Sequence, residues 1–386
     1  MSNRWTGGFI QAYFDPLTAG PAVPSDPGEL YVVGKNSLGQ LGINNVISGS
    51  SPVQIDSSAN WQEIAAGQNH SLAVKSDGTL WTWGYNHRGQ LGQNTLVNVS
   101  SPVQVGALTT WSKATAGNEH SLALKTDGTL WSWGQNGTGM LGDNTSIMRS
   151  SPVQIGALTD WSKISGANEF SLAIKTDGTL WAWGNARYGG PGLNIGGTGV
   201  YKSSPTQVGA LTTWMQVGGG SYFAHAIKTD NTLWALGGVQ SFGRLGDGVA
   251  AFSYRSSPVQ IGALSNWSKV SDGAFGGTAL KTDGTLWAWG NGSSGTMGQN
   301  SAVATNASPL QVGSLTSWSD VVGSDYHIIA TQTDLSVWSW GTNNTGQLGQ
   351  NTTSNVSSPT QIGADTDWLK VADGVVNTHT LFTKAS

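Results

Sequence analysis

Hydrophobic and polar residues alternate in short runs along this chain, and the runs recur at a nearly fixed spacing. In one unit, residues 120–125 read His-Ser-Leu-Ala-Leu-Lys, so Leu122 and Leu124 fall on one side of an extended segment. Residues 130–134 read Leu-Trp-Ser-Trp-Gly and alternate in the same way, with both indoles on one face. A period of two over five or six residues predicts β-strands rather than helices.

A turn signal joins these two runs. Residues 126–129 read Thr-Asp-Gly-Thr, and an Asp-Gly pair between alternating runs predicts a β-hairpin with a type I′ turn, because glycine accepts a positive φ. A polar turn follows, as at 86–92, then a short run such as 102–105 and a strand that begins near Trp111. About four short strands per unit is typical of one blade of a β-propeller.

The unit occurs seven times. A Ser-Pro pair marks each copy, and a tryptophan follows each of these prolines after nine residues. A second landmark, usually Trp-x-Trp-Gly, also occurs in every copy. We expect the first set of tryptophans to pack in the blade cores, and it consists of Trp61, Trp111, Trp161, Trp214, Trp267, Trp318 and Trp368.

The two ends of the chain predict how the repeats close. The last copy stops after residues 368–384, where its hairpin partner should begin, and the missing piece stands at residues 27–34. We therefore predict an all-β, closed seven-bladed β-propeller of four-stranded antiparallel blades, with one blade completed by both termini. Residues 28–386 form the propeller in this interpretation, and residues 1–27 are a non-repeating aromatic leader.

Composition narrows the function. The formal net charge is −4 and the 18 Lys and Arg residues are scattered, so the basic surface of a nucleic-acid binder is not expected. Cysteine is absent, which excludes disulfides and thiolate metal sites. The sequence shows neither a signal-peptide pattern nor an apolar window long enough to span a membrane. We expect synthesis in the cytoplasm and no membrane insertion.

The repeat, with its His-Ser-Leu-Ala-x-Lys-Thr-Asp-Gly-Thr-Leu-Trp-x-Trp-Gly core, resembles the regulator of chromosome condensation repeat. The resemblance covers residues 28–386 and implies a seven-bladed propeller closed by both termini. The founding member of that family is an exchange factor for a small GTPase that docks on chromatin. This chain has neither a long loop to serve as an exchange wedge nor a basic tail. Its nearly identical copies look most like prokaryotic and bacteriophage versions, some of which inhibit an enzyme with a propeller face.

Histidines and acids do not assemble a catalytic pattern. His70, His120 and His327 lie nine residues after a repeat tryptophan, and this slot is filled by Phe170, Phe223, Gly276 and Asn377 in the other copies. A slot shared between blades is best explained by a structural hydrogen bond near the inner rim. The aspartates mostly stand in turns before glycine. We expect no catalytic residues, no metal site and no cofactor.

Non-repeating aromatic residues are the better candidates for partner binding. The leader holds a first group, and the loops with three-residue insertions in two adjacent copies hold a second. Exposed loops on a rigid scaffold are where binding usually occurs, whereas the leader could equally dock on its own propeller. The candidates are Trp5, Phe9, Ile10, Tyr13, Phe14, Tyr188, Tyr201, Phe252 and Tyr254.

These features favour a non-enzymatic structural protein of a bacteriophage particle, in a tail, a fibre or the capsid, anchored by its leader. Its partners would be other virion proteins or a host-surface ligand, and it would reside in the virion. The alternative is a cytoplasmic bacterial binding module or enzyme inhibitor that uses a propeller face. A GTPase exchange factor is the third hypothesis.

Overall fold

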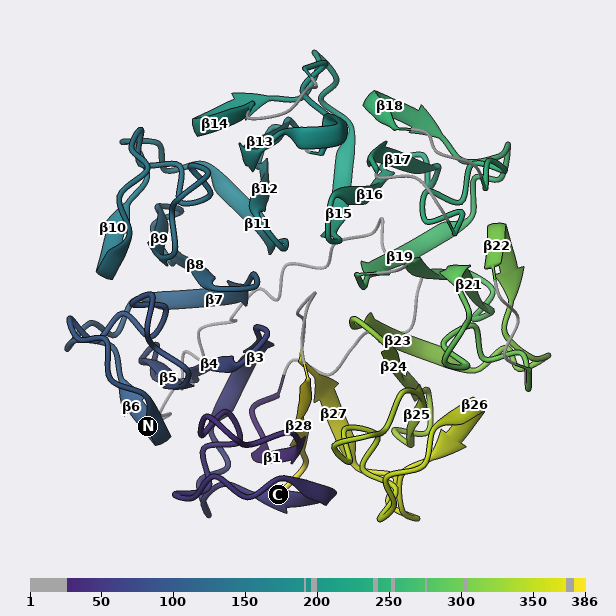
Figure 1. Ribbon diagram of the computed structural model, residues 1–386, viewed down its shortest axis with the longest axis horizontal. Coiled ribbons are helices and arrows are strands. Elements are labelled where there is room, and N and C mark those ends of the chain that lie inside the picture. Colours follow the sequence, from purple (N-terminus) through teal and green to yellow (C-terminus); the bar gives the residue numbers. More distant parts are fainter. Residues whose placement is uncertain are drawn as a thin grey trace, which may run out of the picture.

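Seven four-stranded antiparallel sheets stand around a common axis (Figure 1). The computed structural model describes residues 26–190, 192–195, 200–238, 242–250, 254–274, 276–301, 305–372 and 378–386. Within these ranges the chain forms 28 strands and one short 3₁₀ helix, η1 (Arg187–Gly189). The prediction of an all-β seven-bladed propeller is confirmed.

We number the blades in chain order, so that blade 1 holds β3 to β6 and blade 7 combines β27 and β28 with β1 and β2. The innermost strands are β3 (Trp61–Ala66), β7 (Trp111–Ala116), β11 (Trp161–Gly166), β15 (Trp214–Gly219), β19 (Trp267–Asp272), β23 (Trp318–Gly323) and β27 (Trp368–Val371). The second strands are β4 (His70–Lys75), β8 (His120–Lys125), β12 (Phe170–Lys175), β16 (Phe223–Lys228), β20 (Gly276–Lys281), β24 (His327–Gln332) and β28 (His379–Lys384).

The third strands are β5 (Leu80–Gly84), β9 (Leu130–Gly134), β13 (Leu180–Asn185), β17 (Leu233–Gly237), β21 (Leu286–Asn291), β25 (Val337–Gly341) and β1 (Glu29–Gly34). The outermost strands are β6 (Val99–Gln104), β10 (Arg149–Gln154), β14 (Tyr201–Gln207), β18 (Arg255–Gln260), β22 (Thr305–Gln311), β26 (Val356–Gln361) and β2 (Gly49–Gln54). Each blade therefore runs from the centre outward in the same strand order.

Blade 7 closes the ring with strands from both ends of the chain. β1 pairs with β28 along its whole length, with Val32 opposite Leu381 and Glu29 opposite Lys384. Val32 and Leu381 are fully buried in the core that also holds Trp61 of blade 1. The predicted closure by the two termini is confirmed.

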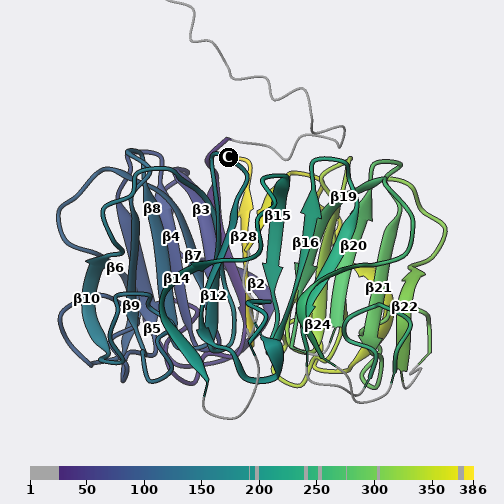
Figure 2. The same ribbon diagram turned by 90° about the horizontal axis from the view of Figure 1, so that it is seen from above.

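The disc has two distinct faces, which are seen edge-on in Figure 2. The upper face carries the hairpin turns between second and third strands, together with Asp26 and the C-terminal residue Ser386. The lower face carries the loops between first and second strands and the longer loops between third and fourth strands. The leader therefore joins the propeller on its upper face.

The hairpins form as predicted, but their turn type differs from the prediction. In residues 75–79 only Gly78 has a positive φ, of 78°, whereas a type I′ turn needs two such residues. Gly78 N–H donates to Lys75 O, and Lys75 N–H donates to Thr79 O, which makes a three-residue loop with a glycine bulge. The Asp77 carboxylate also accepts hydrogen bonds from the Thr79 amide and the Thr79 hydroxyl, and these two bonds stabilise the turn.

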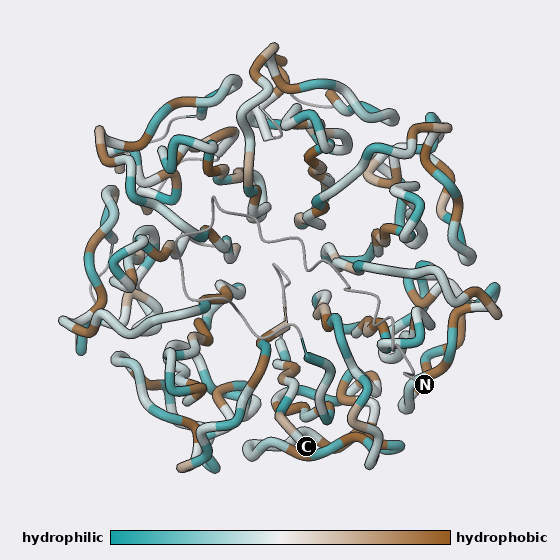
Figure 3. Tube along the Cα trace, turned by 180° about the vertical axis from the view of Figure 1, so that it is seen from behind, coloured by the Kyte–Doolittle hydropathy of each residue, from teal (hydrophilic) through white to brown (hydrophobic). Residues whose placement is uncertain are grey.

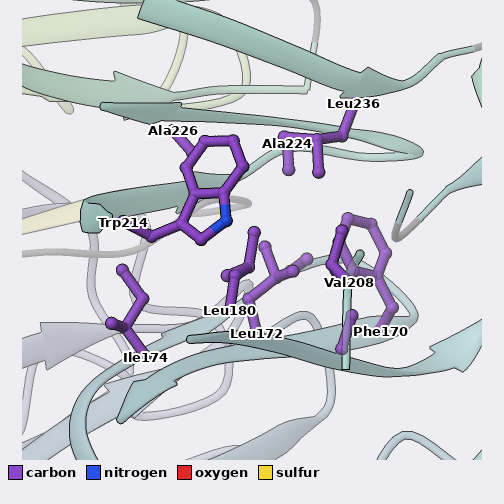
Figure 4. Close-up of a cluster of buried hydrophobic side chains, with 11 residues drawn as sticks. Phe170, Leu172, Ile174, Leu180, Val208, Trp214, Ala224, Ala226 and Leu236 are labelled. Carbon is purple, nitrogen blue, oxygen red and sulfur yellow. The ribbon is translucent and has the colours of Figure 1, made fainter. Parts of the chain in front are cut away.

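The hydrophobic core lies between neighbouring blades rather than inside one sheet. Hydrophobic stretches recur in every blade (Figure 3), and in the close-up of Figure 4 residues of β12 and β13 meet Trp214 from the next blade. Indoles also cross blade boundaries, since Trp133 Nε1 donates to Gln90 O of blade 1 at 2.8 Å. All seven repeat tryptophans are buried, each at most 4% exposed.

A belt of backbone hydrogen bonds runs round the lower outer edge. In each blade, one amide of the long loop donates to a carbonyl on the outermost strand of the next blade. Asn94 N–H, for example, bonds to Ser150 O at 2.7 Å. Asn351 N–H bonds to Ser50 O at 2.7 Å, so that the belt continues across the junction of blades 6 and 7. The ring is thus tied at its rim as well as through its core.

Candidate protein-binding face

The long loop of blade 3 fixes Tyr188 on the lower face. This residue lies in η1 and has a positive φ of 59°. The Asn185 side-chain oxygen accepts a hydrogen bond from the Arg187 backbone amide at 2.8 Å. The Asn185 side-chain nitrogen donates to the Glu169 carboxylate at 2.5 Å. The Arg187 guanidinium lies 4.6 Å from the centre of the Tyr188 ring, close enough for a cation–π contact.

Tyr188 meets a second tyrosine from the next blade. Its ring stands edge-on to that of Tyr222 with the centroids 6.1 Å apart, a favourable geometry for aromatic pairs. Burial raises the pKa of the Tyr222 hydroxyl, and the Glu169 carboxylate raises it further, while the cations Arg187 and Arg244 oppose the rise. Tyr222 therefore stays a neutral phenol that can donate a hydrogen bond.

Arg244 connects this pair to a third tyrosine. Its charge acts on both Tyr222 and Tyr326, and it lies 5.7 Å from the Phe242 ring centre. Tyr326 is 43% exposed, and burial together with the Asp325 charge raises the pKa of its hydroxyl. Burial also raises the pKa of Asp325, to about 7. We call this set the aromatic cluster, consisting of Arg187, Tyr188, Tyr222, Phe242, Arg244 and Tyr326.

The predicted partner-binding residues are only partly brought together. Tyr188 belongs to the aromatic cluster, and Tyr201 pairs with Asn185 at the start of β14, 48% exposed. Tyr254 is 49% exposed just before β18. Phe252 and the leader residues Trp5, Phe9, Ile10, Tyr13 and Phe14 lie outside the described residues, so their roles stay predictions. Loops of blades 3 and 4 with three-residue insertions are adjacent, as expected, because Asn194 N–H bonds to Ser256 O.

Sequence reasoning missed five members of the aromatic cluster, all except Tyr188. Tyr222 and Tyr326 directly precede the start of β16 and β24, a slot that holds Asn69, Glu119 and Glu169 in other copies. This departure from the repeat was the available signal. Phe242 and Arg244 stand in a repeated turn where blade 1 carries Arg88 and Gln90.

The histidines form a structural belt between blades, as expected. The Ser121 hydroxyl donates to Gln90 O at 2.8 Å, so it can accept the proton of His70 Nε2 at 3.0 Å. His120 bonds in the same way to Ser171 at 2.9 Å. His379 bonds to Ser71 at 2.7 Å and stands opposite Gly34. The assignment of the last slot to Asn377 was therefore wrong, because the final copy holds two additional residues before β28.

One acid–histidine pair departs from this belt. His225 Nδ1 lies 2.6 Å from Asp272 Oδ1, and both side chains are fully buried. His225 Nε2 also contacts Leu245 O at 3.1 Å. A substrate cannot reach this pair, which joins blades 4 and 5 where the serine partner is missing. Within the described ranges, no three His, Asp or Glu side chains gather in a way that could hold a metal ion.

In the part of the chain that the structure describes, no helix is long and apolar enough to cross a membrane.

The aromatic cluster thus offers flat phenols and two guanidinium groups, the kinds of side chain most often found at the energetic centre of protein interfaces. Comparison with known families identifies the repeat. The family model described as RCC1-like domain matches residues 19–278, and the regulator of chromosome condensation (RCC1) repeat matches residues 283–331 and 336–382. The chain belongs to the RCC1-like family. The resemblance seen in the repeat sequence is confirmed, whereas its prokaryotic or bacteriophage type stays a prediction.

Individual RCC1-like relatives are distant. The probable E3 ubiquitin-protein ligase HERC6 of Homo sapiens is 32% identical over 152 residues, which are 38% of this chain and 15% of HERC6. This chain therefore spans only a small part of the length of that relative. Human WBSCR16 superposes with a TM-score of 0.81 at 20% identity, over 93% of this chain and 99% of WBSCR16.

Prp20p of Saccharomyces cerevisiae superposes equally well, with a TM-score of 0.81 at 19% identity, over 96% of this chain and 94% of Prp20p. That structure was described together with the binding properties of Prp20p to Gsp1p and histones. At this level of identity both likenesses establish the shared fold. The RCC1-like fold serves many activities, so the function has to be inferred from the site.

Proposed function

We propose that this RCC1-like chain is a non-enzymatic protein-binding propeller and that it holds its partner on the lower face, at the aromatic cluster. The observation that carries the proposal is that the edge-on pair Tyr188 and Tyr222 joins blades 3 and 4, while the charge of Arg244 acts on both Tyr222 and Tyr326 of blade 6. Tyr222, Arg244 and Tyr326 come from three different loops of the repeat on the lower face. A partner would bury the phenol rings and bring carboxylates or carbonyl oxygens next to the two guanidinium groups.

Two substitutions test this proposal without disturbing the blades. Tyr222→Asn and Tyr326→Asn install the residue that blade 1 carries in the same slot, Asn69. Affinity purification of the full chain with quantitative mass spectrometry should recover a stoichiometric partner, and the double variant should lose it at least tenfold. Leu158→Ser on the upper face, 45% exposed, serves as the control and should retain the partner. Equal recovery by all three proteins would refute the assignment.

The finer hypothesis is a structural component of a bacteriophage particle. Its support is the near identity of the seven copies and the aromatic leader. In this hypothesis the partner at the aromatic cluster is another virion protein, and the chain resides in the particle. Mass spectrometry of purified particles from the source should find the polypeptide in a fixed ratio to the other structural proteins, and its absence would end the hypothesis.

Two other partners are compatible with the same face. An enzyme clamped by the propeller would make the chain an inhibitor, and a small GTPase would make it an exchange factor. The exchange activity of the founding member of the family is the reason to include the GTPase. Nucleotide-release kinetics with candidate GTPases would separate this case, because an exchange factor accelerates release whereas a scaffold leaves it unchanged.

A further inference from the structure

A buried asparagine shapes the long lower loop in blades 7, 1, 2 and 6. In blade 1, Asn86 donates to Thr95 O and Val97 O at 3.0 and 3.1 Å and accepts from the Leu91 amide. Asn36, Asn136 and Asn343 make the corresponding bonds in the other three blades. The four asparagines are fully buried. Their hydrogen bonds hold the backbone of each loop in place, including the residues whose side chains face the solvent.

Three adjacent blades use these fixed loops to display apolar side chains. Ile47 of blade 7, Val97 of blade 1 and Ile147 of blade 2 are 72%, 69% and 60% exposed. A second apolar residue accompanies each of them. We call the six together the apolar arc, which consists of Val46, Ile47, Leu96, Val97, Ile147 and Met148. Large apolar side chains that gather in the exposed loops of one face are candidates for an interaction site.

The fold does not require this apolar character. In blade 6, Asn343 makes the same two bonds at 2.9 and 3.0 Å to a loop that carries Thr353 and Ser354 at the equivalent positions. The loop therefore closes equally well with polar side chains. Since the backbone is already ordered, covering the arc costs little conformational entropy.

The charges beside the arc are already paired. Arg149 bonds to Asp143 at 2.8 Å, and Arg88 lies 3.6 Å from Glu119. A ligand for the arc should consequently be apolar and carry no charge. Residues 5–14 of the leader, Trp-Thr-Gly-Gly-Phe-Ile-Gln-Ala-Tyr-Phe, contain no charged residue and five large apolar ones. This segment has the chemistry that the arc would accept.

The position of Asp26 favours a second copy as the source of the segment. The leader joins the upper face, and the arc lies on the lower face. The connection between residue 14 and Asp26 has about twelve residues and spans at most roughly 40 Å. Within one molecule it would have to run around the outer strand of blade 7 to reach the lower face. Between two stacked discs, the upper face of one copy meets the lower face of the next.

We propose that residues 5–14 of one copy dock on the apolar arc of a second copy, so that the propellers associate head to tail. The contact is heterologous, because it joins two different surfaces, and it can therefore repeat along a stack. The residues of the arc are separate from those of the aromatic cluster, so each proposal is tested by its own variants.

Three full-length variants test the contact. The arc variant is Ile47→Ser/Val97→Ser/Ile147→Ser, which copies the residue of blade 6. The leader variant is Trp5→Ser/Phe9→Ser/Phe14→Ser. The control is Val53→Ser/Val103→Ser/Leu310→Ser on the outermost strands β2, β6 and β22, away from both faces, where these side chains are 36–41% exposed. Sedimentation velocity over a hundredfold concentration range should show the parent and the control above monomer mass, and the arc and leader variants at monomer mass.

Mixing the two deficient variants gives the sharper test. The arc variant keeps an intact leader and the leader variant keeps an intact arc, so an equimolar mixture should form a one-to-one dimer and nothing longer. Self-association that persists in the leader variant would show arc-to-arc contact and overturn the proposal. A parent chain that stays monomeric, or a mixture that stays monomeric, would overturn it as well.

Discussion

At the scale of single residues, the buried histidines have a fixed protonation state. The neighbouring hydroxyl donates elsewhere, so Nε2 of His120 keeps its proton, and Nδ1 is buried without a partner. Burial consequently lowers the pKa of His70, His120 and His379 to about 3 and that of His327 to about 4. These imidazoles are neutral in the folded ring at neutral pH.

Acid should therefore destabilise the propeller well above the range where carboxylates titrate. In the unfolded chain these histidines take up protons below about pH 6.5, whereas the folded state resists until pH 3 to 4. Stability is complete above pH 6.5 and falls as the pH drops toward 4. Each such histidine should remove about 2 kcal/mol of unfolding free energy between pH 7 and pH 5.

A double substitution isolates one of these contributions. His120→Phe/Ser171→Ala reproduces the pair that the next junction already uses, Phe170 with Ala224. Urea unfolding at pH 7 and pH 5 should show a pH-dependent loss smaller by about 2 kcal/mol than in the parent. An unchanged loss would mean that His120 titrates normally in the folded state.

At the scale of the element, each third strand has a glycine as its last or second-last residue, and another residue cannot easily replace it. Gly134 ends β9 with φ at 105°, and a Cβ there would lie 2.6 Å from Glu119 O and 2.8 Å from His120 Cα. Both obstacles are backbone atoms of the paired strand, so a side chain could be accommodated only by moving the hairpin. The repeated Trp-Gly thus marks a backbone requirement.

Replacing this glycine should be costly, and the chain provides a comparison. Gly156 also has a positive φ, of 63°, but a Cβ at this position meets nothing within 4 Å. Gly156→Ala should cost about 1 kcal/mol from the left-handed conformation alone. Gly134→Ala should cost at least about 2 kcal/mol more, because the clash adds to that strain. Denaturant midpoints of the two variants would check the difference, and similar midpoints would contradict it.

The loop asparagine is a second element-scale requirement. Asn136→Ala would leave the Leu141 amide and two loop carbonyls without their bonds. Buried polar groups that lose a partner cost about 1–3 kcal/mol each. We expect a loss of at least about 2 kcal/mol in unfolding free energy, together with faster amide exchange confined to residues 136–148. Exchange that stays at the parent rate would show that the loop is held by other contacts.

At the scale of the whole molecule, closure depends on the pairing of β1 with β28. A permuted chain that links Ser386 to Asp26 and opens at the exposed turn after Gly156 retains every strand of the ring. We expect it to keep the far-ultraviolet spectrum and a melting temperature near that of the parent. Deleting residues 379–386 should instead abolish cooperative melting, because it removes Leu381 and Phe382 from two inter-blade cores.

The architecture could be predicted from the sequence because each copy repeats the same pattern of strands, turns and tryptophans. The spacing of the tryptophans and the divided last copy specified seven blades and their closure. The slot of His379 was misassigned because fixed spacing was assumed across an insertion. The aromatic cluster escaped notice for another reason: Tyr222, Arg244 and Tyr326 stand in three separate loops, and the departure of each from the repeat does not by itself show that the folded chain brings them near one another.

Because blade 7 contains strands from both ends of the chain, it can be completed only at the end of translation. Roughly 350 residues are added between β1 and β28, which takes a ribosome on the order of 20–70 s at 5–20 residues per second. Throughout that interval Leu30 and Val32 lack the strand that buries them. Every incomplete chain therefore has two blade surfaces without their neighbours. A chain that stops before His379 should aggregate rather than form a smaller propeller.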